Sequence, residues 1–128
     1  MADETAVREP QYVYRARLVK VIDGDTIDVD LDVGFGVWLH KQRLRLYGIN
    51  TPETRGVERP EGLAAKAFVQ AELPLSRPLL IQTHADKKGK YGRWVAEVWY
   101  LSHHDPSGTL QNLNKVLVAE GHAKEVSY

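Results

Sequence analysis

Hydrophobic and polar residues alternate along the first third of the chain in the manner of β-strands. From Ile27 to Val33 every second side chain is apolar and aspartates fill the positions between, which is the period-two pattern of a strand with one buried face. We expect these aspartates to lie on the solvated face. Segments 12–22 and 37–47 show similar, less regular alternation, and glycines separate all three segments. The pattern therefore predicts three sequential strands.

The apolar spacing changes in the middle of the chain. A polar loop over 48–61 is closed by Pro60, and apolar residues at helical spacing then predict a helix over 61–72. Segments 79–83 and 93–100 again have the character of strands. Thr109 is predicted to cap a last helix that ends at Gly121.

The order of these elements is typical of a mainly β protein of the oligonucleotide-binding (OB) fold. Three strands, a helix, two strands and a helix suit a five-stranded Greek-key barrel with two to three packed α-helices. A mixed α+β sandwich would give a similar order and stays open as an alternative. Residues 1–10 are polar and acidic and are interpreted as a flexible leader, which leaves 11–128 as a single domain.

Composition narrows the classes of partner. The chain has 17 Lys and Arg against 17 Asp and Glu, so a polyanion would have to be bound by local clusters of cations. The absence of cysteine excludes disulfides, thiolate metal sites and cysteine nucleophiles. No segment has the length and apolar character of a signal or a membrane span. We therefore expect a monomer without membrane association, located by default in the cytoplasm.

Oxygen ligands for a cation occur at two predicted strand ends. Asp23 and Asp25 flank a glycine before the second strand, and Asn50 and Thr51 follow the third. Carboxylate, amide and hydroxyl oxygens suit Ca²⁺ or Mg²⁺ better than zinc. If the two strands are neighbours, these ends approach each other. Asp-Gly-Asp is also an ordinary turn sequence, and this alternative remains.

Three further residues complete a set suited to phosphodiester chemistry. Glu53, which follows Pro52 in the polar loop, could deprotonate a water molecule as a general base. Arg45 and Arg93 offer guanidinium groups, each of which can bind two phosphate oxygens at once. Taken singly, these residues are equally well explained as a solvated loop glutamate and two surface arginines. Taken together, they indicate metal-assisted hydrolysis of a phosphodiester.

The segments 22–26, 45–54 and 90–93, in this order and spacing, closely resemble the staphylococcal (micrococcal) nuclease family. The resemblance extends over about 12–128 and includes the late segment 113–123. It implies an OB barrel and a Ca²⁺-dependent phosphodiesterase that acts on DNA and RNA, expels the 5′ oxygen and leaves 3′-phosphate ends. Ca²⁺ is the cation it favours, with Mg²⁺ or another divalent ion as alternatives.

The resemblance also implies a role for each residue. Asp25, Asn50 and the backbone carbonyl of Thr51 would hold the metal, and Asp23 would be an acid near the metal that does not bind it. Glu53 would activate water, and Arg45 and Arg93 would clamp the phosphate. Lys90 and Tyr91 would contact a terminal phosphate of the substrate.

This chain departs from the family pattern at three places. Asn50 stands where the family commonly has a second metal-binding aspartate, so we predict a weaker affinity for the metal. The loop after Glu53 is shorter than in the staphylococcal enzyme. A substrate-stacking tyrosine of the family would fall on Ser127 or Tyr128, which leaves that role open.

Other features permit two interpretations each. The loop 103–105 (His-His-Asp) could bind a metal or be exposed to solvent. The basic turn 87–90 could contact phosphates or only solvent. The three tryptophans could stack on bases or pack the barrel. The rival function is a catalytically silent module that binds nucleic acid or protein. Zero net charge favours this rival, whereas the complete set Asp25, Arg45, Glu53 and Arg93 favours an enzyme.

Overall fold

The first three predicted strands are present and form a meander. The computed structural model of the chain describes residues 11–73, 78–84, 94–102 and 107–126. Within them, β1 (Val13–Asp23), β2 (Thr26–Asp32) and β3 (Trp38–Leu46) pair antiparallel in sequence order. The predicted leader over 1–10 lies outside the described residues.

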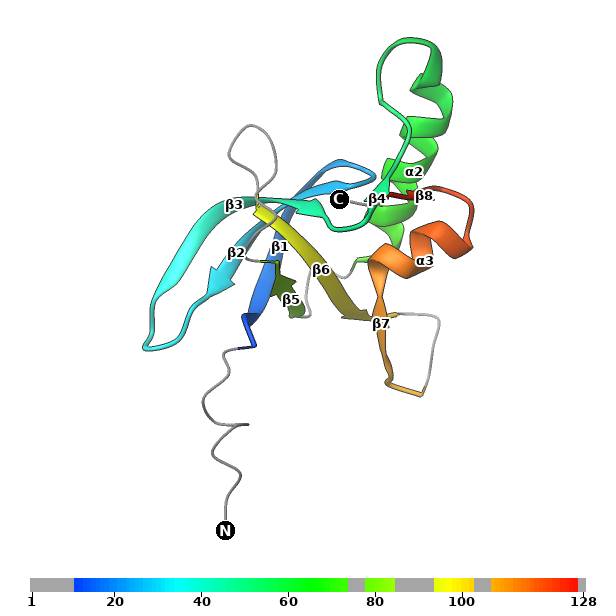
Figure 1. Cartoon of the computed structure of the whole chain (residues 1–128). Coiled ribbons are helices and arrows are strands. Elements are labelled where there is room, and N and C mark those ends of the chain that lie inside the picture. The colour runs from blue at the N-terminus through cyan, green and yellow to red at the C-terminus, as the bar shows by residue number, and fades with distance from the viewer. Residues whose placement is uncertain (1–10, 74–77, 85–93, 103–106, 127–128) are drawn as a thin grey trace.

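The second half of the chain closes this meander into a barrel (Figure 1). β5 (Leu79–Thr83) pairs antiparallel with β1 and with β6 (Trp94–Leu101), and β6 runs parallel to β3. The β3–β6 pairing joins the two ends of the five-stranded sheet, which confirms the OB-type barrel and excludes the sandwich. β7 (Leu110–Asn112) extends the sheet beyond β6.

The core of the barrel contains the side chains that the alternation predicts. Ile27, Val29 and Leu31 of β2 are buried, and the aspartates between them are partly exposed. The other strands contribute their own alternate positions, such as Leu44 and Leu46 of β3. Removal of this apolar surface from water is the main stabilising contribution to the barrel.

Two α-helices pack beside the barrel, and the first begins earlier than predicted. The 3₁₀ turn η1 (Gly56–Glu58) leads directly into α2 (Arg59–Glu72), which packs against β1. Pro60 therefore lies in the first turn of the helix instead of before it, a position where its missing N–H has no intrahelical partner to lose. Among the described residues, no helix combines the length and apolar character needed to cross a bilayer.

The predicted cap of the last helix is wrong. The helix α3 (Leu113–Ala119) is capped by Asn112, whose side chain accepts a hydrogen bond from the backbone N–H of Lys115 at 3.2 Å. Thr109 lies before β7, which occupies the residues between it and the helix. The predicted end is confirmed, because Gly121 has a φ of +79° and follows the last turn as a left-handed terminator.

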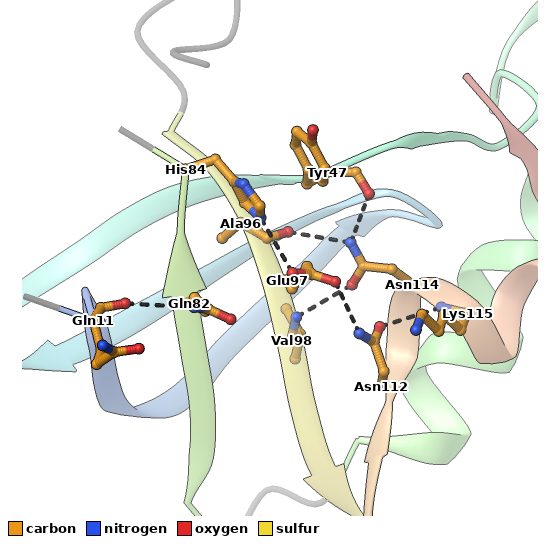
Figure 2. A network of polar contacts seen from close by, with 10 residues as sticks. All are labelled: Gln11, Tyr47, Gln82, His84, Ala96, Glu97, Val98, Asn112, Asn114 and Lys115. Carbon is orange, nitrogen blue, oxygen red and sulfur yellow. Dashed lines mark hydrogen bonds and ion pairs between the residues drawn. The ribbon is translucent and has the colours of Figure 1, made fainter. Parts of the chain in front are cut away.

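A buried asparagine fixes α3 to the barrel (Figure 2). The side-chain amide of Asn114 donates to the carbonyls of Tyr47 and Ala96 at 2.9 and 3.2 Å, and its oxygen accepts the N–H of Val98 at 3.2 Å. All three partners are backbone groups, so one side chain joins α3 to β6 and to the end of β3.

Two very short strands continue from these elements. β4 (Ile49–Asn50) pairs antiparallel with β8 (Lys124–Glu125), which follows α3. Strands of two residues have too little pattern to be predicted, and neither was expected. Their pairing places Asn50 opposite Lys124 and so positions the end of β4 relative to the barrel.

Candidate active site

The carboxylate of Asp25 is the centre of the candidate site. Its Oδ2 atom accepts a hydrogen bond from the backbone N–H of Thr51 and lies beside Nη1 of Arg45, each at 3.1 Å. Its Oδ1 atom accepts the hydroxyl of Thr26 at 3.1 Å. Asp25 therefore joins the β1–β2 turn, the end of β3 and the residue after β4.

Arg45 connects this carboxylate to Asn50. The register between β2 and β3 pairs Thr26 with Arg45, which places the arginine directly beside the β1–β2 turn. Its Nη2 atom donates to the side-chain oxygen of Asn50. The structure thus brings together four predicted residues, Asp25, Arg45, Asn50 and Thr51. The argument from neighbouring strand ends expected Asp25, Asn50 and Thr51 to approach one another but did not include Arg45.

The group is partly withdrawn from water and internally neutral. The side chains of Asp25 and Arg45 are each only 14% exposed. At such a position the attraction between the two charges is stronger than at the open surface. Asn50 adds an oxygen donor but no charge, so the guanidinium balances the carboxylate.

The donor set fits a hard divalent cation. Among the described residues, no three His, Cys, Asp or Glu side chains are grouped so that they could hold a metal ion. The possible ligands at this site are instead the carboxylate of Asp25, the amide oxygen of Asn50 and Thr51. The hydroxyl oxygen of Thr51 is buried and has no hydrogen-bond partner, and such an atom is costly unless a ligand satisfies it. Oxygen donors of these kinds are the ligands of Ca²⁺ and Mg²⁺.

Asp23 braces the loop that follows. Its Oδ1 atom accepts the hydroxyl of Thr54 at 3.0 Å. This bond links the end of β1 to the polar loop that carries Glu53. Asp23 thereby positions the loop. That Asp23 lies near the metal without binding it remains a prediction.

Glu53 lies exposed on this loop, two residues after Thr51. Its backbone N–H donates to Oε1 of Glu58 at 3.2 Å. Behind it, α2 presents Gly62, where an added Cβ atom would lie 2.1 Å from the carbonyl oxygen of Glu53. The loop therefore rests directly on the helix backbone, which leaves the carboxylate facing solvent.

A second glycine allows a similar close approach on the other side of the site. A Cβ atom on Gly24 would lie 2.8 Å from Cβ of Ala65 in α2 and 3.0 Å from Cγ2 of Thr51. Real Cβ atoms essentially never approach as closely as the contact with Ala65, and the contact with Thr51 would be tight, so glycine lets the β1–β2 turn pack against the helix and Thr51 without a shift. The two glycines set the spacing of Asp25, Thr51 and Glu53.

Sequence reasoning missed four residues that position the site. Thr54 lies in the segment 45–54 that carries the resemblance, but no role was predicted for it or for Glu58, because single polar residues in a polar loop are ordinary. Gly62 does show a signal, since a glycine inside a helical pattern often marks a close packing contact. Gly24 was interpreted only as a turn residue.

Several predicted site residues cannot be placed. Arg93, Lys90 and Tyr91, the basic turn 87–90, the loop 103–105 and the final two residues lie outside the described ranges. Their roles remain predictions. Of the tryptophans, Trp94 is 42% exposed and neither of the other two is fully buried.

The chain matches a known family model over most of its length. The model described as Staphylococcal nuclease homologue matches residues 43–128. A thermonuclease of Staphylococcus intermedius is 37% identical over 98 residues, which are 74% of this chain and 52% of that protein. A thermonuclease of Staphylococcus hyicus is 35% identical over 86 residues, 65% of this chain and 47% of the relative.

A third relative is an uncharacterised protein of Methanocaldococcus jannaschii. It is 30% identical over 131 aligned positions, which cover 87% of this chain and 58% of the relative. The chain thus spans about half the length of the curated relatives it matches.

Proposed function

Because this chain belongs to the staphylococcal nuclease homologue family, we propose that it is a divalent-cation-dependent nuclease that hydrolyses phosphodiester bonds of DNA, RNA or both. The observation that carries the proposal is the grouping of Asp25, Arg45, Asn50 and Thr51 around one carboxylate. The loop that bears Glu53 begins at this group.

The substrate phosphate would be bound by arginine beside the cation site. Asp25, Asn50 and Thr51 would hold Ca²⁺, which supplies Lewis-acid polarisation of a phosphoryl oxygen when bound. Arg45 can place its planar guanidinium on two phosphate oxygens. Arg93, assigned from the sequence alone, would add a second guanidinium and so balance the charge that grows on phosphorus in the transition state.

Glu53 would act as the general base. It would accept a proton from water as the water oxygen bonds to phosphorus and the bond from phosphorus to the 5′ oxygen breaks. The departing 5′ oxygen takes a proton from solvent, and the phosphate stays on the 3′ side. The exposed position of Glu53 allows its carboxylate to reach a substrate and its attacking water.

A second candidate function is a module that binds nucleic acid without cutting it. Two observations favour it: Asn50 provides an amide in place of a carboxylate, and Lys and Arg are balanced by Asp and Glu, 17 against 17. Both features weaken cation and polyanion binding, but neither removes the proposed base or the arginine clamp.

Cleavage assays with a matched control variant decide between the two. Single-stranded DNA, duplex DNA and RNA are incubated with Ca²⁺, Mg²⁺ or EDTA. We expect cation-dependent cleavage that leaves 3′-phosphate ends and that falls by about 10²–10⁴-fold in Glu53→Gln. The control Glu61→Gln removes another exposed carboxylate, in the first turn of α2, and should keep full activity.

Two results would reject the nuclease mechanism. Cleavage that persists in EDTA, or in Glu53→Gln, would show that neither the cation nor this glutamate is needed. Oligonucleotide binding without cleavage under any of these conditions would favour the silent module.

A further inference from the structure

The outer face of the β1–β2–β3 sheet carries an ordered arrangement of charges that the proposed chemistry does not use. β2 presents aspartates along the middle of this face, and the strands on both sides present cations. One row across the sheet consists of Lys20, Asp28 and Arg43, which are register partners in β1, β2 and β3. The central negative charges are therefore flanked by positive ones.

A shallow hollow of about 690 Å³ lies on this face. Three of its lining side chains are cationic and one is anionic, and all six are Val19, Lys20, Ile22, Asp28, Lys41 and Arg43. Lys20 and Lys41 are exposed. The hollow thus carries a net positive charge in a chain whose overall charge is zero.

The aspartates of the face are already bound within the protein. Arg43 holds Asp28 through two hydrogen bonds of 2.8 and 3.1 Å, and Asp28 raises the pKa of this arginine. Asp30 accepts the backbone N–H of Lys41 at 3.0 Å, which lowers the pKa of its carboxyl group. The two lysine ammonium groups are therefore the positive excess of the hollow.

Two other hollows among the described residues lack this excess. A hollow of about 390 Å³ between β4, β8 and α3 is lined by Lys115 together with Glu97 and Glu125. One of about 160 Å³ beside Asn50 carries one lysine, Lys124, and one glutamate, Glu58. Charge complementarity to a polyanion thus favours the hollow on β1–β3.

One lining residue of the hollow, Arg43, lies close along β3 to Arg45 of the candidate active site. Arg43 and Arg45 are two residues apart in β3, and alternate side chains of a strand point to the same face. Their separation along the strand is about 7 Å. A nucleic-acid strand clamped at Arg45 therefore has cations for its next phosphates along β3.

The same hairpin ends in exposed aromatic and apolar residues. Phe35 is fully exposed and has a φ of +56°, between Gly34 and Gly36, which also have positive φ. Fully exposed as it is, the ring packs against no described residue that could offset the cost of this backbone conformation. Trp38 follows on β3, with the guanidinium of Arg17 4.6 Å from the centre of its ring. This hairpin lies on the opposite side of the barrel from α2 and α3 (Figure 1).

We propose that the outer face of β1–β2–β3 binds a single-stranded segment of the nucleic-acid substrate beyond the cleaved bond, with phosphates on Lys20 and Lys41 and a base stacked on Phe35. The inference rests on the proposed function of the Arg45 site. A single strand is specified because stacking on an aromatic side chain needs an unpaired base, while a cationic groove follows its backbone.

Binding measurements test this surface without any requirement for cleavage. A fluorescein-labelled 12-nucleotide dT strand is titrated, at several salt concentrations, into Glu53→Gln protein with and without Lys20→Glu and Lys41→Glu. We expect at least a tenfold loss of affinity and a salt slope smaller by about 1.4, because each phosphate contact to a single strand contributes about 0.7. The matched control, Lys66→Glu with Lys115→Glu, changes the net charge equally on α2 and α3 and should bind like its parent.

Phe35→Ser tests the stacking contact separately. We expect affinity for the dT strand to fall about fivefold or more with an unchanged salt slope, because stacking releases no counterions. Unchanged affinity would overturn the stacking contact. The exposed Phe35 would then be better explained by contact with a membrane or a protein partner. Circular dichroism of every variant verifies that the barrel is folded.

A short substrate separates failure of this surface from failure of the proposed function. A dinucleotide has a single phosphate, which Arg45 would clamp, and none for Lys20 or Lys41, so its kcat/KM should be the same in wild type and in the Lys20→Glu, Lys41→Glu variant. The KM for the 12-nucleotide strand should rise in that variant. Equal binding of the 12-nucleotide strand by this variant and by the lysine control would overturn the surface, whatever the cleavage result. A wild-type protein that binds the strand through these lysines but cuts neither substrate would overturn only the proposed function.

Discussion

The Nη1 atom of Arg45 lies 3.1 Å from Oδ2 of Asp25, so the proposed phosphate clamp is ion-paired with the carboxylate proposed to bind the cation. Among the described residues of this group, Asp25 supplies the one carboxylate, and the guanidinium balances its charge. Asn50, which also contacts Arg45, contributes an oxygen without charge. The cation affinity of the site is therefore expected to depend on residue 50.

Asn50→Asp should raise the affinity for Ca²⁺ by about tenfold or more, that is, by about 1.4 kcal/mol. A second carboxylate restores the negative charge that the amide lacks. Isothermal titration calorimetry of both proteins with Ca²⁺ measures the change. Gln42→Glu adds a carboxylate elsewhere on β3 and should leave the affinity unchanged. Equal or weaker binding in the Asn50→Asp protein would contradict this account of the site.

Gly62→Ala should impair catalysis although alanine favours helices. The added methyl group would lie 2.1 Å from the carbonyl oxygen of Glu53, so the loop must move away from α2. We expect kcat to fall at least tenfold with a smaller change in KM, and stability to fall by about 1–3 kcal/mol.

Steady-state kinetics and urea unfolding of Gly62→Ala measure both effects. Ala67→Ser, an exposed substitution in the same helix, should change neither by much. A Gly62→Ala protein with normal kcat would show that the position of Glu53 does not depend on this contact.

Two asparagines that lie two residues apart should differ in their importance for stability. Asn114→Ala removes three side-chain hydrogen bonds to backbone groups of β6 and of the end of β3 and should lower the free energy of unfolding by about 3–5 kcal/mol. Asn112→Ala removes a helix cap and a bond to Glu97 and should cost about 1–2 kcal/mol. Urea unfolding ranks the two variants, and the reverse order would disprove the assigned role of Asn114.

The hydroxyl of Tyr100 should make stability depend on pH at the alkaline end. Tyr100 is buried and donates to Oε2 of Glu72 at 2.6 Å, and burial, followed by this carboxylate, raises its pKa. A raised pKa in the folded state contributes stability below the unfolded value of about 10, and this contribution is lost as the pH rises further.

Tyr100→Phe should therefore be less stable than wild type by about 1–2 kcal/mol at pH 7, and the difference should shrink above about pH 10. Urea unfolding at pH 7 and pH 10.5 measures it, with the exposed Tyr12→Phe as the control. A difference that stays constant across this range would contradict the role of the buried hydroxyl.

Local pattern was sufficient for the five barrel strands and the first helix because their signals repeat over several residues. β2 shows this most clearly, since its buried apolar positions Ile27, Val29 and Leu31 all follow from the alternation. The cap at Thr109 failed because three residues of β7 intervene, and a strand so short carries little pattern of its own. The pairs formed by β4 and β8 were missed for the same reason.

The sequence by itself determined which chemical groups are available: the carboxylate of Asp25, the guanidinium of Arg45, the amide of Asn50 and the isolated Glu53. Only the tertiary structure decided how these groups meet. The β2–β3 register places Arg45 beside Asp25, where burial strengthens the attraction between opposite charges. Gly24 and Gly62 then allow backbone contacts closer than any side chain permits, and that spacing depends on segments packed together from distant parts of the chain.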